Sequence, residues 1–292
     1  MWKKLLKNYM YIFYIGLYFL IAWVMLGGDT KAFFVTFITY TLSILLALSP
    51  LGEALLRFIQ QIRPLRTQEE KEYLLPIFNE VYESAKEQNP NLNGDIELYI
   101  DDKMYINAFA VGRKTVAVSM GAIQTFSSSE LKGIISHELG HISNGDTKAL
   151  LLTVIGNGIF TILIFLMKVI LAIIQFIFDL IPIPFLNFFP LITKYIFDAV
   201  FLIFTFSSQL VLAANSRVNE VFADKFAFEC GYGEELKSSL YILQKISIPS
   251  DISLIDRLRA SHPHTAKRIE NIEKLLEQEE LEEVEELETT AV

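Results

Sequence analysis

The sequence predicts an α+β, mainly α, polytopic membrane protein with about four transmembrane helices and an extramembrane domain that contains a small antiparallel sheet. Hydrophobic residues make up 52% and aromatic residues 13% of the 292 residues. The mean hydropathy is +0.38, and such values exceed those of ordinary soluble domains. Uncharged apolar runs cover residues 9–26, 32–51, 149–167 and 199–214. The charge-rich block between the second and third runs has the composition of a globular domain.

The first two runs are each long enough to cross a bilayer as a helix. They contain 18 and 20 residues without a charge, close to the roughly 20 residues that a spanning helix needs. A cleavable signal peptide is the alternative for the first run, because Lys3, Lys4 and Lys7 precede it. The run is long for a signal peptide and leads directly into the second run. We therefore expect an uncleaved transmembrane hairpin over residues 1–56.

Basic residues flank this hairpin at both of its ends. They are Lys3, Lys4, Lys7, Arg57, Arg63 and Arg66. Between the two runs, Lys31 is the single basic residue. The positive-inside rule then places the amino terminus and the chain after residue 51 in the cytoplasm.

Residues 57–148 are expected to form the first part of a cytoplasmic domain. Thr67 and Glu70 fit a capping box that opens an amphipathic helix over 67–88. Segments 96–101, 105–111 and 115–119 are rich in β-formers and are separated by turn residues, so they predict a small antiparallel sheet. A second capping box, Ser127 with Glu130, opens the helix that carries the next motif.

The segment His137-Glu138-Leu139-Gly140-His141 has the spacing of a zinc-binding helix. Residues four apart are offset by only about 40° around a helix axis, so His137 and His141 project from one face. Hydrolytic zinc sites take three protein ligands and keep a position for water, which a Glu beside the first His reaches as a base. The motif predicts His137 and His141 as zinc ligands and Glu138 as the catalytic base. The alternative is a structural pair of surface histidines. A His-Glu-x-x-His pattern is improbable by chance in a chain that has only 4 His.

A third ligand is predicted in segment 219–224. Glu220 and Asp224 lie one helical turn apart, so their side chains share a helix face. Glu220 is the candidate zinc ligand. Asp224 is the candidate acceptor for the distal N–H of a ligand histidine, an interaction that orients the ring and raises its basicity. The pattern alone is weak evidence, because a solvated helix face often carries Glu and Asp at this spacing.

The positions of His141 and Glu220 constrain the topology between them. The two residues are 79 positions apart, with two apolar runs in between, and both must reach one zinc ion. An even number of membrane crossings therefore separates them. Two spans predict a second transmembrane hairpin over 149–214, followed by a second cytoplasmic part over 215–276. A buried hydrophobic hairpin with no crossing satisfies the same condition.

The acidic tail, Cys230 and His264 are not expected to take part in catalysis. Eight Glu lie within 277–288 and account for most of the net charge of −9, and the composition of the tail 277–292 predicts disorder. No basic face with interleaved aromatic residues is present in the sequence, which argues against nucleic acid as a partner. Cys230 is expected to be a small buried side chain rather than a reactive thiol. His264, close to His262, is expected to be a solvated loop residue.

Several segments together resemble the HtpX-like heat-shock membrane zinc metallopeptidases, which are related to the type 1 CaaX prenyl proteases. The resemblance covers most of the chain. It rests on the opening hairpin and on segments 107–110, 116–119, 136–141, 144–146, 216–217, 220–224 and 262–263 with Arg268. It implies a cytoplasmic gluzincin-type zinc peptidase domain with one Zn²⁺ per chain, held by His137, His141 and Glu220.

The resemblance also implies roles for residues outside the ligand set. Asn107 and Ala108 match an edge strand that pairs with the substrate backbone, so they are candidate substrate-binding residues. His262 and Arg268 match groups that stabilise the tetrahedral intermediate. They are candidate catalytic residues together with Glu138.

The resulting hypothesis is a zinc metalloendopeptidase of the bacterial cytoplasmic (inner) membrane whose active site faces the cytoplasm. The resemblance implies a stress response role in membrane-protein quality control, with unfolded or damaged membrane proteins as substrates and the lipid bilayer as the surroundings. A transport protein is the alternative from another class, because Lys168 and Asp198 lie near membrane depth. A catalytically silent scaffold is a second alternative.

Overall fold

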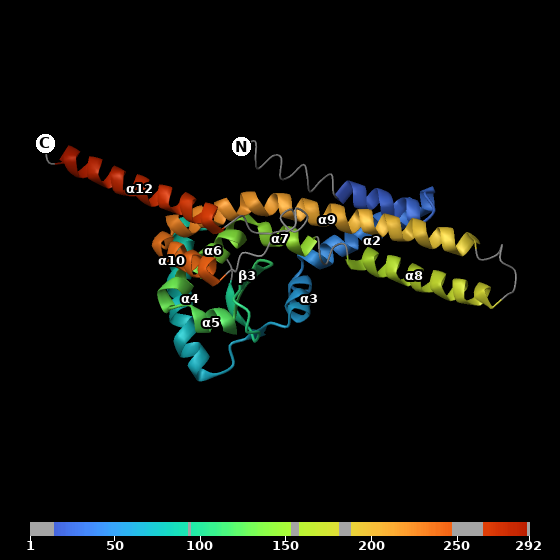
Figure 1. Ribbon diagram of the computed structural model, residues 1–292, viewed down its shortest axis with the longest axis horizontal. Coiled ribbons are helices and arrows are strands. Elements are labelled where there is room, and N and C mark those ends of the chain that lie inside the picture. The colour runs from blue at the N-terminus through green and yellow to red at the C-terminus, as the bar shows by residue number, and fades with distance from the viewer. Residues whose placement is uncertain (1–14, 93–94, 153–157, 181–187, 247–264, 291–292) are drawn as a thin grey trace. The chain divides into compact units, whose positions relative to one another are not determined.

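The computed structural model describes residues 15–92, 95–152, 158–180, 188–246 and 265–290 (Figure 1). The chain divides into two compact units, each built from two separate stretches of sequence. Unit 1 comprises Met1–Ser49 and Leu152–Leu212, and unit 2 comprises Pro50–Leu151 and Ala213–Val292. Helix α9, Phe188–Glu229, contributes its first part to unit 1 and its second part to unit 2.

Within its described residues, unit 1 consists of helices. They are Ile15–Met25, α2 (Thr30–Leu48), α8 (Gly158–Asp179) and the first part of α9. The Asp29 carboxylate accepts a hydrogen bond from the Ala32 amide at 2.7 Å and thereby caps the start of α2. Tyr18 and Tyr40 stack with their ring centroids 5.8 Å apart, which joins the first helix to α2.

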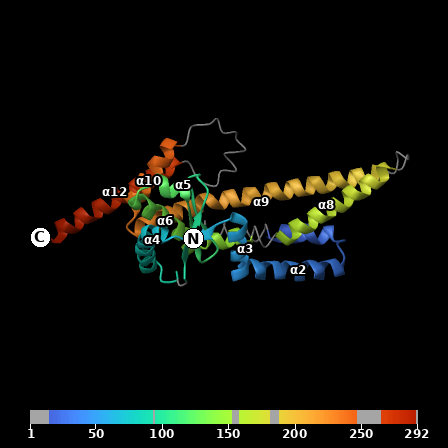
Figure 2. The same ribbon diagram turned by 90° about the horizontal axis from the view of Figure 1, so that it is seen from below.

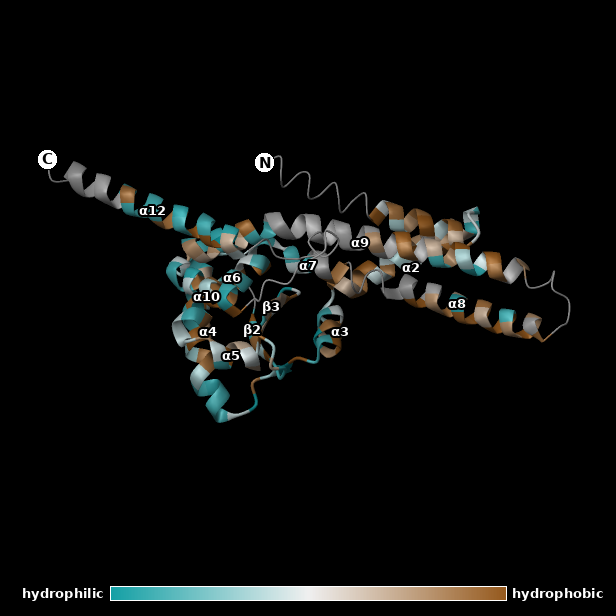
Figure 3. Ribbon diagram, in the orientation of Figure 1, coloured by the Kyte–Doolittle hydropathy of each residue, from teal (hydrophilic) through white to brown (hydrophobic). Residues whose placement is uncertain are grey.

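In the described part of the chain, α2 is the one helix that is long and apolar enough to cross a membrane, with a mean hydropathy of 1.8. Ile15–Met25 and Phe165–Phe178 are shorter apolar helices. Figure 3 shows α2 and α8 as largely hydrophobic ribbon. Parts of the predicted runs 9–26 and 149–167 lie outside the described residues. The structure thus provides one clear candidate span, and the number of about four spans stays a prediction.

An ion pair joins α8 to α9 within unit 1. The Lys168 Nζ and Asp198 Oδ1 atoms are 2.5 Å apart, and α8 runs beside the first part of α9 in both Figure 1 and Figure 2. The two residues therefore neutralise each other's charge between neighbouring helices. This arrangement gives them a structural explanation and weakens the alternative of a transport pathway.

Unit 2 contains the sheet and the helices that carry the motifs. In chain order its elements are α3 (Pro50–Gln60), β1 (Arg63–Pro64), α4 (Gln68–Gln88), β2 (Glu97–Asp101), β3 (Ala108–Val111), β4 (Thr115–Ser119), α5 (Met120–Thr125), α6 (Ser128–Asn144), α7 (Asp146–Leu151), the end of α9, α10 (Gly233–Ile246) and α12 (Thr265–Thr290). Both predicted capping boxes are present, at Thr67 with Glu70 and at Ser127 with Glu130. They confirm the predicted starts of α4 and α6.

The sheet has four strands in the order β1-β2-β4-β3. β1 pairs with β2 and β3 pairs with β4 in antiparallel fashion, whereas β2 and β4 are parallel. The sheet is therefore mixed, and the prediction of an antiparallel sheet is wrong on this point. The turn at 112–114 makes β3 and β4 a hairpin, and the longer link 102–107 carries the chain past β4, so that β4 rather than β3 lies beside β2. β3 is consequently an edge strand.

The core of unit 2 forms where α4 and α6 pack with the sheet. Its deeply buried members include Leu74, Val81, Ile100, Val116, Leu131, Ile135 and Leu139. Cys230 belongs to the same cluster, and burial raises the pKa of its thiol to about 11. A thiol with so high a pKa is unreactive at neutral pH, as the sequence predicts.

The acidic tail differs from its prediction. Composition predicts disorder over 277–292, but α12 extends from Thr265 to Thr290. Glu and Leu are strong helix formers, and Ile269 and Ile272 anchor the start of α12 in an apolar cluster with Leu236 and Leu240 of α10. The packed first turns therefore start a helix that the acidic sequence can continue.

Candidate metal centre

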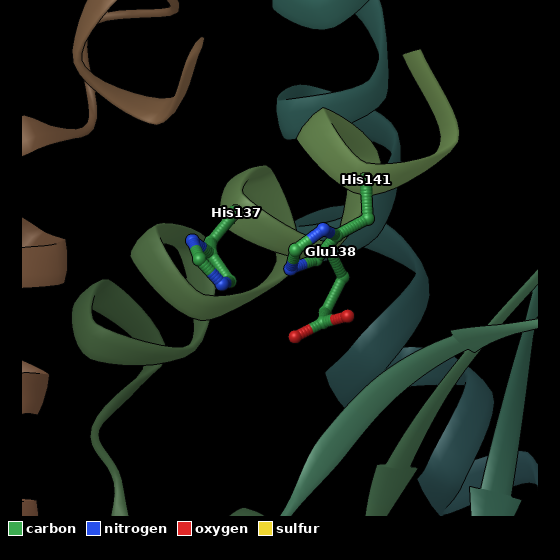
Figure 4. Close-up of side chains that lie close together, drawn as sticks. All are labelled: His137, Glu138 and His141. Atoms are coloured by element: carbon green, nitrogen blue, oxygen red, sulfur yellow. The ribbon is translucent and has the colours of Figure 1, made fainter. Parts of the chain in front are cut away.

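Helix α6 presents His137 and His141 side by side (Figure 4). Their rings are nearly perpendicular, with the centroids 4.8 Å apart, as expected for residues one turn apart on one helix face. Glu138 extends beside them, and one potential ligand atom from each of the three residues lies within 4.8 Å of the others. His137 and Glu138 are buried. The motif therefore forms a compact cluster of potential metal donors.

The second part of α9 brings Glu220 to the two imidazoles. Its Oε2 atom is 3.5 Å from the Nε2 atom of His137, and its Oε1 atom is 3.4 Å from the Nε2 atom of His141. Close packing of α9 on α6 makes these contacts possible. A side chain at Gly140 would place its Cβ atom only 2.9 Å from the Cα atom of Ala223, so only glycine allows this approach.

These donors fit one zinc ion. Tetrahedral zinc with bonds of about 2.0–2.1 Å to N and O atoms holds neighbouring ligand atoms about 3.3 Å apart. The Glu220 Oε2–His137 Nε2 and Glu220 Oε1–His141 Nε2 separations of 3.5 and 3.4 Å are each close to that spacing, and each involves a different oxygen of the carboxylate. Glu138 lies in the same cluster, but Glu220 directs one carboxylate oxygen to each imidazole. Two imidazoles and one carboxylate form a donor set that catalytic zinc sites use.

A carboxylate orients each of the two imidazoles. The Nδ1 atom of His137 is 3.0 Å from Oδ1 of Asp224. The Nδ1 atom of His141 is 3.1 Å from Oδ2 of Asp146. Such partners fix the ring orientation of a ligand histidine and raise its basicity.

The contact of Asp146 with His141 is one that the sequence reasoning missed. Asp146 is reached because Gly145, with φ of 77°, ends α6 in the left-handed conformation and turns the chain back toward His141. Asn144 donates a hydrogen bond to the second oxygen of Asp146 at 2.8 Å. The available signal was the segment Asn144-Gly145-Asp146, which begins three residues after His141, since glycine after a helix end commonly reverses the chain.

Arg268 of α12 lies at the centre of this cluster rather than on the solvated side of its helix. Its Nη2 atom is 2.6 Å from Oδ1 of Asp224, and its Nη1 atom is 3.2 Å from Oε2 of Glu220. The guanidinium also lies 3.2 Å from the Nδ1 atom of His137. Arg268 is 8% exposed, so its charge is stabilised chiefly by the two carboxylates.

The carboxylates and the guanidinium set the pKa values of the site in the absence of metal. Burial lowers the pKa of His141, but Asp146 and Glu220 outweigh it and raise that pKa to about 10. Burial and the charge of Arg268 lower the pKa of His137, and hydrogen bonds to Asp224 and Glu220 reverse this into a net rise. Burial raises the pKa of Asp224, whereas His137 and Arg268 hold it below its usual value. A metal ion that binds here must displace protons from the imidazoles.

A cavity of about 210 Å³ opens beside the cluster. Asn107 and Ala108, the predicted substrate-binding residues, line it together with His137, Glu138 and Arg268. Apolar side chains form another part of the lining, namely Phe126, Ile134, Leu236, Leu240 and Leu243. The structure thus brings five of the predicted site residues to one cavity. The predicted residue His262 lies outside the described residues, as does His264.

The fold and the cluster together define a class of protein. A helix with the His-Glu-x-x-His pattern, a glutamate from a second helix and an adjoining edge strand are the parts of a zinc peptidase site. Residues 68–276, more than two thirds of the 292 residues, match the sequence model of Peptidase family M48. The chain belongs to Peptidase family M48.

Individual relatives agree with this assignment. The chain is 37% identical over 99 residues to "Protease HtpX" of Wigglesworthia glossinidia brevipalpis, a match that covers 32% of this chain and 33% of that protein. It is 25% identical over 217 residues to "Protease HtpX homolog 1" of Sulfurisphaera tokodaii, which covers 61% of this chain and 68% of that protein. The chain spans about a third of the length of the first curated relatives that it matches. The resemblance to HtpX-like proteins is confirmed.

A solved structure shares the fold. The crystal structure of S. mikatae Ste24p superimposes with a TM-score of 0.51 and 18% sequence identity, and the match covers 92% of this chain and 65% of that chain. At this identity the likeness concerns the fold alone. It supports the mainly helical architecture with a small sheet.

Proposed function

We propose that this chain is a membrane-bound zinc endopeptidase. The observation that carries the proposal is the approach of the two Glu220 oxygens to the Nε2 atoms of His137 and His141, at 3.5 and 3.4 Å. Membership in Peptidase family M48 supports the peptidase chemistry. The apolar helix α2 supports attachment to a membrane.

The metal would be held by His137, His141 and Glu220. When bound, zinc supplies Lewis acidity, which polarises the scissile carbonyl and acidifies the attacking water. Asp224 and Asp146 hold the two imidazoles through their Nδ1 atoms. This leaves both Nε2 atoms directed to the side where Glu220 lies.

Glu138 is the proposed base. Its carboxylate takes a proton from the attacking water and later delivers that proton to the leaving amine, so that the same side chain acts as base and then as acid. Glu138 is suited to this role because it belongs to the same cluster as the imidazoles and lines the cavity beside them. No covalent attachment of the substrate to the chain is needed.

The edge strand β3 is the proposed guide for the substrate. Ala108 begins β3, and Asn107 precedes it; both line the cavity that contains His137 and Glu138. An extended peptide that pairs with a free strand edge is recognised mainly through its backbone. Such binding accepts many sequences, which suits an endopeptidase that degrades diverse proteins.

Arg268 and His262 are proposed to stabilise the oxyanion that forms during attack on the carbonyl. Arg268 lines the cavity through which the carbonyl would approach. Its Nη1 and Nη2 atoms lie near Glu220 and Asp224, so part of the guanidinium is already held in place. Preorganised donors of this kind act more strongly on the transition state than on the bound peptide.

The proposed setting is the bacterial cytoplasmic membrane, with four spans and the metal site on the cytoplasmic side. The basic flanks of the first two apolar runs support this orientation. The length and aromatic content of the apolar runs support a second hairpin over 149–214, and two crossings meet the condition that an even number separates His141 from Glu220. The proposed substrates are unfolded or damaged membrane proteins, as the resemblance to the HtpX-like peptidases implies.

A cleavage assay on the purified full chain tests the activity. We expect the wild-type chain, loaded with zinc, to cleave an unfolded protein substrate, and the Glu138→Ala variant to keep zinc but lose cleavage. Glu72→Gln, on the exposed surface of α4, is the matched control and should cleave normally. Equal cleavage by wild type and Glu138→Ala would contradict the proposal.

A further inference from the structure

Helix α3 has two faces of opposite character. Its apolar side chains Leu51, Leu55, Phe58 and Ile59 are 65%, 40%, 80% and 53% exposed. They recur at the spacing i, i+4, i+7 and i+8 and therefore form one stripe along the helix. Glu53 and Leu56, on another side of the helix, are 6% and 1% exposed. An 11-residue helix with so large an exposed apolar stripe needs an apolar environment on that side.

The position of α3 in the chain indicates which environment this is. The proposed span α2 ends at Leu48 and α3 begins at Pro50, so the start of α3 lies within a few residues of the level at which the chain leaves the bilayer. A short amphipathic helix at that level buries its apolar side in the boundary between headgroups and acyl chains. Figure 3 shows both hydrophobic and hydrophilic ribbon along α3.

The polar side of α3 binds the turn between β3 and β4. The Glu53 carboxylate accepts hydrogen bonds from the backbone amides of Arg113 and Lys114, both at 3.1 Å, and from the Thr115 hydroxyl at 2.7 Å. Arg57 donates a hydrogen bond to the same hydroxyl at 3.0 Å. The turn is shaped for this contact, because Gly112 has a φ of +63° and a Cβ atom there would overlap with Glu53.

We propose that α3 lies in the surface of the lipid bilayer, with its apolar stripe among the acyl chains, and that Glu53 thereby holds the β3–β4 turn at the membrane surface. β3 is the edge strand that lines the candidate site, so this contact fixes one end of that strand. The inference rests on the proposed span α2 but not on the peptidase chemistry.

Fluorescence quenching by brominated lipids tests the membrane contact. The full chain, with Trp2 and Trp23 replaced by Phe, would carry one new tryptophan, by Phe58→Trp in α3, Phe37→Trp in α2 or Tyr73→Trp in α4. Phe37 and Tyr73 are 54% and 42% exposed. In vesicles, we expect Phe58→Trp to be quenched most by bromine near the headgroup end of the acyl chains. Phe37→Trp should be quenched by deeper bromine, and Tyr73→Trp should be quenched least.

The three tryptophan variants distinguish a failure of the proposal for α3 from a failure of the proposed span α2. Quenching of Phe37→Trp without quenching of Phe58→Trp would overturn the proposal for α3 and leave the span intact, and it would point to a second copy or another protein on this face. Absence of quenching in both would overturn the span and the proposal together. Zinc content measured in each preparation shows whether the metal site remains intact in either case.

Hydrogen exchange tests the connection to the turn. We expect Phe58→Asp, which removes the apolar stripe from the lipid, to increase the exchange rates of the Arg113 and Lys114 amides in vesicles. Tyr73→Asp is the control and should leave both rates unchanged. Unchanged exchange in a Phe58→Asp chain that still binds zinc would show that bilayer contact does not hold the turn.

Discussion

Each imidazole of the candidate centre has a carboxylate of its own, and the two pairs have different origins. Asp224 follows Glu220 by one turn of α9, so a single helix supplies both a ligand candidate and the partner of His137. Asp146 lies beyond the end of α6 and reaches His141 only because Gly145 reverses the chain. The position of Asp224 beside the ligand candidate Glu220 can be predicted from helical spacing. The second pair depends on a turn whose direction the spacing of the residues does not specify.

We expect Asp146→Asn to weaken zinc binding without abolishing it. The amide cannot support the imidazole of His141 as the carboxylate does, so zinc affinity should fall by about 10–100-fold. Competition with a zinc-selective chelator measures the affinity. Asp95→Asn, at a side chain that is 94% exposed, is the matched control, and an equal affinity in both variants would exclude a role for Asp146.

Arg268 could have either of two roles in the candidate site, and substitution of the residue distinguishes them. If the guanidinium stabilises the oxyanion, Arg268→Lys should lower kcat by roughly 10²–10³ while zinc content stays the same. If Arg268 only neutralises buried Asp224 and Glu220, the main effect should be loss of zinc or of stability. Kinetics and zinc content of Arg268→Lys, with exposed Lys267→Ala as control, distinguish the two. His262→Ala should show the kinetic effect alone.

The helices and strands were largely predictable, and the order of the strands was not. Capping boxes fixed the starts of α4 and α6 because each depends on residues only three positions apart. Richness in β-forming residues, together with the separating turn residues, located the strands 97–101, 108–111 and 115–119 to within a few residues. The parallel pairing of β2 with β4 depends on how the link 102–107 crosses the sheet. No local pattern encodes that crossing, and the two-residue strand β1 is too short to leave a signal.

The start of α4 should show a pH-dependent contribution to stability. Hydrogen bonds from Arg63 lower the pKa of Glu70 to about 2, and the Nη2–Oε1 distance is 2.7 Å. Because this pKa lies below the ordinary value of 4.5, the interaction stabilises the fold above about pH 4.5, and the stabilisation is lost as the pH falls toward 2.

Thermal unfolding of the detergent-solubilised chain measures this contribution. The difference in Tm between wild type and Glu70→Gln should be largest near neutral pH and should shrink as the pH is lowered below about 4.5. Glu69→Gln, at the exposed neighbouring position, should show no such trend. A difference in Tm that is independent of pH would mean that the charge of Glu70 contributes nothing.

The two units alternate along the chain, so the candidate site depends on the return of the chain after residue 212. His137 and His141 precede the second stretch of unit 1, and Glu220 follows it. Sequence alone required an even number of crossings between them but left open whether that number is two or zero. Apolar length indicates where spans are possible, whereas depth in the bilayer also depends on the lipid.

Accessibility of single cysteines tests the topology of the whole chain. In a Cys230→Ser background, we expect Gly28→Cys to react with an impermeant thiol reagent in intact cells. Lys71→Cys, on the exposed side of α4, should react only after lysis. Labelling of Lys71→Cys in intact cells would place the domain on the outer side of the membrane and overturn the proposed orientation.

We expect Glu220 to complete a zinc site in which Glu138 acts as the base. Zinc per chain, measured on purified Glu220→Ala and Glu138→Ala together with their cleavage rates, tests it most directly. We expect Glu138→Ala to retain one zinc per chain without cleavage and Glu220→Ala to lose both zinc and cleavage. A Glu220→Ala chain with one zinc and a wild-type rate would show that Glu220 is not a zinc ligand.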